Sequence, residues 1–391
     1  MEETFTALTN LLAEDRLLWH PAPFKETDLP WQSSHQELAN ACLTLADSAV
    51  EALEAQPQQL LLWLSRYLPQ MNSLEQLIKL PFAVYKMSPA DNHWQAGIPG
   101  RKFEQIQAFA SAIQPGGACW LDWCSGKAHL GRSLSSWYRL PCIGVERDWQ
   151  LCRQGKMLAE SQHAPVQFVT TDVLQAGLTL APDNHVVALH ACGDLHRSLI
   201  RRASQSPVAA ISLAPCCYPL WLEGNYQPLS QAGRRLPLTL TRDELHLAVQ
   251  ESVTAHEREL IQARKLAAWR LGFDQLQRQL RNCDEYLPTP SLPLSAVHWG
   301  FESVCRKLVE WKQLPLPSNI DWRHFQKLGE QRWQQVRRKQ LVRHGYRRAL
   351  EVWLVLDAAL CLQEAGYQVQ VEQFCPRELT PRNILINARA S

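Results

Sequence analysis

A repeated alternation of short apolar segments and helical patterns, between residues 119 and 213, constrains the fold more than any other feature. Short apolar segments bounded by turn residues are typical of buried strands, and the stretches between them carry apolar residues at helical spacing. The expected strands cover residues 119–122, 142–146, 166–170, 185–190 and 209–213. Strands separated by helices form βαβ units, so we predict an α/β fold with a doubly wound parallel sheet.

This alternating pattern stops near residue 218 and resumes near residue 345. Residues 219–344 contain helical patterns and Pro-rich joints, and a strongly apolar helix is expected at 346–365. Two more strands, at 367–374 and 383–388, then complete a seven-stranded sheet as a hairpin-like pair. The expected parts are an N-terminal helical region (1–95), an α/β domain (96–218 and 345–391) and a helical insertion for substrate binding (219–344).

The turn after the first expected strand has the composition of a nucleotide-binding loop. Gly126 lies between the strand end at Asp122 and the next helix, where main-chain N–H groups can face a ligand. Glu146 ends the second strand 20 residues beyond Gly126, the place from which a carboxylate holds ribose hydroxyls. Asp172 follows the third strand. A single glycine is a weak signal, because a dinucleotide-binding loop normally has three. The two carboxylates at the strand ends strengthen the interpretation of this turn as a nucleotide-binding loop.

Four sequence motifs follow one another in the order of the expected strands. They are Asp122–Gly131, Gly144–Asp148, Leu189–Leu195 and Ala214–Tyr218. Together they resemble a methyltransferase family that includes the methyltransferase domain of the glutathione S-transferase C-terminal domain-containing protein. The resemblance covers about residues 100–220, and Ala128 departs from it at a position where relatives commonly have glycine.

The resemblance implies an enzyme of the class I methyltransferases, with a seven-stranded Rossmann-like sheet and S-adenosylmethionine as cofactor. The residues expected beside the cofactor are Asp122, Cys124, Gly126, Lys127, His129, Glu146, Asp172 and His190. Lys102 and Glu104, in the helix before the first strand, either brace this site or are surface charges.

The methyl acceptor is expected at the ends of the fourth and fifth strands. The candidate catalytic residues there are His190, Cys192, Asp194, Cys216 and Cys217. A general base is needed only if the acceptor loses a proton, and His190 or Asp194 could serve as one or only shape the loop. RNA cytosine-C5 methyltransferases use a cysteine after one of these strands as nucleophile, although their own motifs do not match here. These thiols together with His190 and His196 could ligate zinc, but packing is the simpler interpretation and we predict no metal.

Charge is distributed unevenly along the chain. Residues 1–55 carry a net charge of −8, and residues 323–348 carry +8. The basic stretch is interleaved with aromatic residues such as Trp333, and this combination suits RNA, because cations bind phosphates and aromatic rings stack on unpaired bases. The residues predicted to bind RNA, as tRNA or rRNA, are Arg332, Arg337, Arg338, Lys339 and Arg343. The alternative is a solvated amphipathic helix.

Two other functions and the compartment complete the expectations. A protein or small-molecule methyltransferase would use the same domain, and a non-catalytic RNA-binding scaffold would keep only its fold. No stretch is apolar enough to span a membrane, and the acidic start Met1–Phe5 lacks the pattern of a secretory signal. Several of the 12 cysteines fall in expected core strands, where reduced thiols pack as small apolar groups, so we expect a cytoplasmic protein.

Overall fold

The computed structural model of the chain describes residues 1–84, 98–175, 177–250 and 257–391. The chain forms two compact units: unit 1 comprises residues 1–13, 74–253 and 347–391, and unit 2 comprises residues 14–73 and 254–346. Both the expected N-terminal region and the expected insertion are therefore divided between the units. The boundary expected at residue 95 lies outside the described residues.

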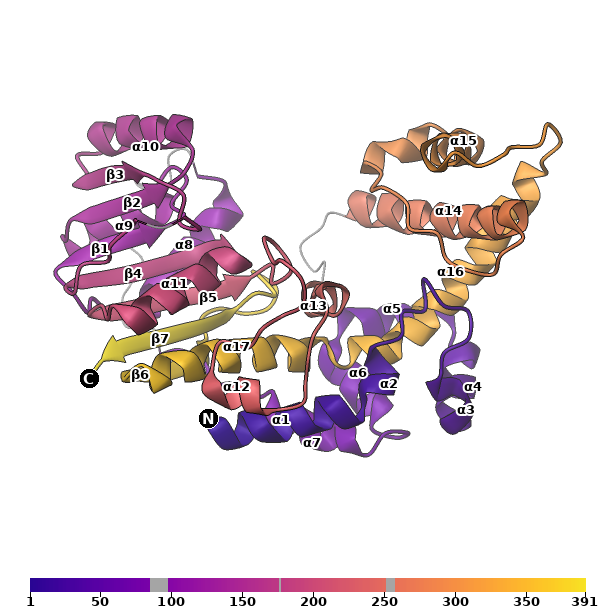
Figure 1. Cartoon of the computed structure of the whole chain (residues 1–391), viewed down its shortest axis with the longest axis horizontal. Coiled ribbons are helices and arrows are strands. Elements are labelled where there is room, and N and C mark those ends of the chain that lie inside the picture. Colours follow the sequence, from indigo (N-terminus) through magenta and orange to yellow (C-terminus); the bar gives the residue numbers. More distant parts are fainter. Residues whose placement is uncertain (85–97, 176, 251–256) are drawn as a thin grey trace. The chain divides into compact units, whose positions relative to one another are not determined.

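Unit 1 is built on a seven-stranded sheet, as predicted (Figure 1). The strand order is β3-β2-β1-β4-β5-β7-β6. Strands β1 to β5 run parallel, and β7 is antiparallel to both of its neighbours, β5 and β6. The strands are β1 (Cys119–Trp123), β2 (Cys142–Glu146), β3 (Val166–Thr170), β4 (Asn184–Cys192), β5 (Ala210–Cys216), β6 (Tyr367–Gln373) and β7 (Ile384–Ala390). The last two strands form the predicted hairpin-like pair.

Helices pack against this sheet and explain why its central strands are apolar. Every residue of β5 is buried, which is typical of a strand covered on both faces. Among the helices, α8 packs on α9, and α11 packs on α17. The helices around the sheet are α8 (Gly100–Ser111), α9 (His129–Tyr138), α10 (Trp149–Ser161), α11 (Asp194–Gln205) and α17 (Arg347–Glu364). Aromatic residues of α8 and β1, Phe109 and Trp120, belong to the same apolar core as Phe374.

Three further helices of unit 1 lie outside this alternation. They are α1 (Glu2–Glu14), α12 (Gln231–Arg235) and α13 (Arg242–Val249), while α7 (Gln70–Leu77) spans the boundary between units. A capping box begins α13, with Thr241 and Glu244 each accepting from the other's main-chain N–H. Helix α1 is tied to α17 by a hydrogen bond of 2.8 Å from the Trp353 indole to the Thr9 hydroxyl.

Unit 2 is helical, and its centre is the packing of α14 on α16. The two helices approach closely at Gly272 and Gly329, where a Cβ on Gly329 would lie 2.3 Å from the Ala268 carbonyl oxygen. Only glycine fits such a crossing. The elements of this unit are α2 (Arg16–Trp19), α3 (Trp31–Ser34), α4 (Gln36–Thr44), α5 (Asp47–Ala55), α6 (Pro57–Leu64), α14 (Glu257–Arg281), the 3₁₀ helix at Leu294–His298, α15 (Phe301–Lys312) and α16 (Trp322–His344).

The sequence predicts reduced cysteines and no stretch that spans a membrane. All 12 cysteines are free thiols, and six of them are buried. Within the described parts of the chain, no helix combines the length and the apolar character needed to cross a bilayer.

Candidate cofactor and acceptor site

The loop between β1 and α9 is shaped by three residues in the left-handed backbone region. Their φ angles are 59° at Cys124, 57° at Gly126 and 50° at Ala128. Ala128 adopts this conformation as the N-cap of α9, so a side chain at this position is accommodated at a cost of about 1 kcal/mol. A Cβ on Gly126 would meet nothing within 4 Å, so the glycine faces open space. The loop therefore offers main chain to a ligand.

Asp122 is buried at the end of β1 and fastens the start of α9. Its Oδ2 accepts a hydrogen bond of 2.9 Å from the Gly131 N–H. Gly131 can approach because it has no Cβ, which would lie 2.6 Å from the Cys142 sulfur. Desolvation raises the pKa of Asp122 to about 7, against the opposing effects of the Gly131 N–H and the Lys102 ammonium.

Glu146 joins the end of β2 to the cofactor loop. Its Oε2 accepts from the Gly126 N–H at 3.0 Å, and its Oε1 accepts from the Arg147 and Asp148 N–H groups at 2.9 and 3.0 Å. Oε2 accepts only one of these bonds and keeps a free lone pair, so a ribose hydroxyl can still donate to it. Nearby, the buried Ser125 hydroxyl has no hydrogen-bond partner among the described residues. An open glycine, a strand-end carboxylate and an unsatisfied hydroxyl together fit a nucleoside ligand.

The other predicted cofactor residues differ in how far they are buried and in their hydrogen-bond partners. Asp172 follows β3, and its Oδ1 accepts from the Leu174 N–H at 2.9 Å. Lys127 is half-buried in the loop. His129 is instead buried in the first turn of α9, where its Nδ1 lies 2.7 Å from an Arg132 nitrogen. Desolvation and the Arg132 cation lower the pKa of His129 to about 4, so the ring is neutral at pH 7.

His190 lies where β4 loses its regular register, and it is predicted both as a cofactor residue and as a base. Its φ of 74° is unusual for a residue with a side chain. The Nε2 atom lies 3.1 Å from the Gln105 amide oxygen, which makes Nε2 the protonated nitrogen and leaves Nδ1 as an acceptor. Desolvation and the Lys102 cation lower the pKa of His190, so the imidazole is neutral and able to take up a proton.

Sequence reasoning missed Gln105, which orients the His190 ring. The amide of Gln105 also donates to the Leu379 carbonyl at 3.2 Å, so its position is fixed by main chain. Lys102 and Gln105 are three residues apart and share one face of α8, a spacing that could have indicated the pair. Of the two charges proposed to brace the site, Lys102 acts electrostatically on Asp122 and His190.

Asp194 begins α11 and is held by two arginines. The Arg197 and Arg201 guanidinium groups lie 3.4 and 3.3 Å from its carboxylate oxygens. The two ion pairs and its place in the first turn of α11 hold this carboxylate in position. The surroundings of Asp194 therefore suit a residue that shapes the loop, while those of His190 suit a base.

The predicted cysteines converge at the ends of β4 and β5. Cys192 and Cys216 are register partners of adjacent strands, and their sulfurs are 3.5 Å apart. Cys217 completes a group whose three sulfurs all lie within 4.8 Å of one another. His196, in contrast, is buried with its Nδ1 3.1 Å from the Ala191 carbonyl oxygen.

The cations predicted to bind RNA lie on α16 and make contacts within unit 2. Arg337 pairs with Glu54 at 2.6 Å, and Arg338 pairs with Asp47 at the same distance. Arg343 donates to the Trp19 carbonyl at 2.7 Å. The acidic stretch and the basic stretch of the sequence thus neutralise each other in part, and these three side chains are engaged inside the unit.

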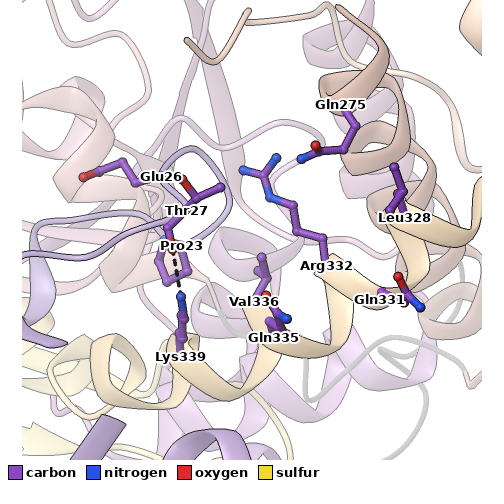
Figure 2. A pocket seen from close by; sticks show the side chains of 10 residues that line it. All are labelled: Pro23, Glu26, Thr27, Gln275, Leu328, Gln331, Arg332, Gln335, Val336 and Lys339. Atoms are coloured by element: carbon purple, nitrogen blue, oxygen red, sulfur yellow. Dashed lines mark hydrogen bonds between the residues drawn. The ribbon is translucent and has the colours of Figure 1, made fainter. Parts of the chain in front are cut away.

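The two remaining cations of this set line a cavity of about 240 Å³ in unit 2 (Figure 2). Arg332 forms an ion pair with the buried Asp274, and Lys339 donates to the Thr27 carbonyl at 2.8 Å. Figure 2 also shows glutamine side chains around the cavity. The lining residues are Pro23, Glu26, Thr27, Gln275, Leu328, Gln331, Arg332, Gln335, Val336 and Lys339.

The strand order and the family comparison together decide what unit 1 is. A sheet of this order, with an antiparallel seventh strand between strands five and six, is the arrangement of class I methyltransferases. Residues 101–222 match the family model of a methyltransferase domain. Unit 1 has the fold of a class I methyltransferase, and its residues 101–222 resemble a methyltransferase domain. The open space beside Gly126 is compatible with the S-adenosylmethionine cofactor of such domains.

Solved structures of low similarity include other methyltransferases. A Pyrococcus abyssi tRNA (uracil-54, C5)-methyltransferase with S-adenosyl-L-homocysteine is 15% identical over 28% of this chain and 27% of its own, with a TM-score of 0.24. A precorrin-6y C5,15-methyltransferase from Geobacter metallireducens is 14% identical over 34% of this chain and 72% of its own, with a TM-score of 0.25. The chain spans less than two thirds of the length of several such structures. No curated protein sequence matches it.

Proposed function

We propose that the protein is an S-adenosylmethionine-dependent methyltransferase that acts on RNA, with tRNA or rRNA as the substrate class. The observation that carries this proposal is the cavity of unit 2, where Lys339 stands beside the amides of Gln275, Gln331 and Gln335, while Arg332 lines the cavity and is paired with Asp274. Cations attract phosphate groups, and amides offer both a donor and an acceptor to the edges of unpaired bases.

Exposed aromatic and basic residues of unit 2 support the same substrate. Trp299 is 46% exposed, which leaves its ring available for stacking on bases. Trp311 is 41% exposed and has the Lys307 ammonium 5.6 Å from the centre of its ring. Arg323 and Lys327, on the first turns of α16, are also exposed. They belong to the same basic stretch as the internally paired arginines but remain open to solvent.

The cofactor-side residues of the proposed site are those of the loop and the strand ends. The main chain at Gly126 and the carboxylates of Glu146 and Asp172 would hold the nucleoside, and the buried Asp122 fixes the loop on which they act. When bound, S-adenosylmethionine supplies an electrophilic methyl group on a sulfonium. The sequence motifs also resemble, more narrowly, the methyltransferase domain of the glutathione S-transferase C-terminal domain-containing protein.

The chain's own contribution to methyl transfer is alignment and proton removal. A positioned acceptor reacts faster because the entropy of alignment is lost on binding rather than in the reaction. We assign His190 as the group that takes a proton from the acceptor, at Nδ1, because Gln105 holds its other nitrogen. This step is needed only for an acceptor that carries a proton on the methylated atom.

Incubation with labelled S-adenosylmethionine and separate RNA, protein and small-molecule fractions tests the proposal. We expect label in RNA, and a Gln331→Ala/Gln335→Ala double variant should transfer less of it. Gln326→Ala is the matched control, because this glutamine also lies on α16 but pairs with Glu330 outside the cavity. Label found only in the protein or small-molecule fraction would overturn the proposal for RNA and leave the methyltransferase assignment intact.

A further inference from the structure

Three thiols from two adjacent strands meet at one edge of the sheet. Cys192 ends β4 and Cys216 ends β5, and the strand register places them opposite each other. Their sulfurs are 3.5 Å apart, and both lie within 4.8 Å of the Cys217 sulfur. Cys216 is buried, whereas Cys192 and Cys217 are partly exposed, so the group is open to solvent on one side.

The backbone adopts unfavourable conformations around this group. His190 and Cys217 have φ angles of 74° and 47°, and the register of β4 shifts between Leu189 and Cys192. Gly193 follows, and a Cβ there would lie 2.0 Å from the Leu220 carbonyl oxygen. Such conformations each cost about 1–3 kcal/mol and occur mostly at functional sites. Here they bring three sulfurs together, which apolar packing alone does not require.

The arrangement matches the ligand set of a thiolate-bound metal. Tetrahedral zinc binds sulfur at about 2.3 Å, which places neighbouring sulfurs about 3.8 Å apart. This spacing is close to the 3.5 Å between Cys192 and Cys216 and falls within the 4.8 Å that bounds all three sulfurs. We propose that Cys192, Cys216 and Cys217 bind a zinc ion, with the fourth position open to water or to an atom of the substrate. Each thiol would lose its proton to solvent on binding.

The convergence of the three sulfurs distinguishes a metal site from the site of a covalent nucleophile. A covalent nucleophile needs one accessible thiolate beside a base, not three convergent sulfurs of which one is buried. An open zinc site at the ends of β4 and β5 would polarise the bound atom, and this role does not depend on whether the substrate is RNA.

Metal uptake by the full-length protein tests the proposal. Protein purified under reducing conditions and freed of metal with a chelator is titrated with Zn²⁺ in competition with a chromophoric chelator, and with Co²⁺ to observe thiolate charge-transfer absorption. We expect one equivalent of metal per chain. Cys192→Ser and Cys217→Ser, at partly exposed positions, should each weaken binding by more than about 100-fold, because the loss of an outer partner alone costs about 10- to 100-fold.

Cys119→Ser is the matched control. This cysteine is also partly exposed and belongs to the same sheet, but it begins β1 and bonds to the Trp120 carbonyl. Its substitution should leave metal affinity unchanged, and circular dichroism should show that all three variants are folded. The absence of uptake, uptake that survives in Cys192→Ser and Cys217→Ser, or cobalt spectra without thiolate absorption would overturn the proposal.

Discussion

The sequence predicts ligand-binding residues both in the cofactor loop of unit 1 and on helix α16 of unit 2. The two sets of residues differ in the contacts that they make in the structure. At the loop, Glu146 bonds directly to Gly126, the residue 20 positions before it. On α16, Arg337 and Arg338 pair with carboxylates of the same unit. The spacing of a motif predicts local backbone geometry. A run of basic residues indicates only that the cations need anionic partners, and these can be carboxylates of the same protein or phosphates of a ligand.

The largest effect on the free energy of unfolding is expected at the buried ion pair between Arg332 of α16 and Asp274 of α14. Asp274→Ala should lower the free energy of unfolding by about 3–5 kcal/mol, because it leaves the buried Arg332 and its neighbour Arg278 without their carboxylate. Asp284 also pairs with Arg278 but is 89% exposed, so Asp284→Ala should stay within about 0.5 kcal/mol. Chemical denaturation measures both. If both variants lost the same free energy of unfolding, burial would not determine how much these ion pairs contribute to stability.

A second effect tests the loop through pH. Desolvation raises the pKa of Asp122 from 3.8 to about 7, so between about pH 4 and pH 7 the folded protein binds a proton that the unfolded chain has lost. This residue therefore makes stability fall as pH rises through that window. Asp122→Asn keeps an acceptor for Gly131 and removes the penalty, and it should stabilise the protein by up to about 4 kcal/mol at pH 8.

Denaturation of both proteins at pH 4.5 and pH 8 checks the sign. The gain from Asp122→Asn should be small at the lower pH, where Asp122 is protonated in the folded state. A gain of the same size at both pH values would mean that the carboxyl group is not held in its neutral form.

A third, smaller effect compares two ion pairs. Arg337 and Glu54 have side chains that are 6% and 23% exposed, and their double-mutant cycle should give a coupling of about 1–2 kcal/mol. Lys156 and Glu160 on α10 are 4.0 Å apart and 71% and 66% exposed, so their coupling should stay below about 0.5 kcal/mol. Similar couplings for the two pairs would contradict a structural role for Arg337.

The smallest effect on stability concerns the glycine of the loop. Gly126→Ala and Gly224→Ala should each cost about 1 kcal/mol, because both residues have positive φ and open space around the missing Cβ. Only Gly126→Ala should weaken S-adenosylmethionine binding, by about tenfold or more. Calorimetric titration separates the two, and equal affinities for both variants would place the cofactor elsewhere.

Features that depend on local sequence could be predicted, whereas features that depend on tertiary packing could not. The seven strands, the apolar helix before β6 and the place of Glu146 follow from local periodicity and motif spacing. The burial of His129 was missed because it depends on how α9 packs against the sheet, and the role of Gln105 was missed because it depends on how α8 lies beside the end of β4. The joining of residues 14–73 with residues 254–346 is a tertiary contact between distant segments, and composition showed only its charge complementarity.

Calorimetric titration with S-adenosylmethionine tests the central claim most directly, with the parent protein beside Glu146→Ala and Glu160→Ala. We predict one equivalent bound by the parent and by Glu160→Ala, whose glutamate lies exposed on α10, and binding lost in a folded Glu146→Ala variant. A folded parent protein that binds no S-adenosylmethionine, or a Glu146→Ala variant that binds it equally well, would contradict the account.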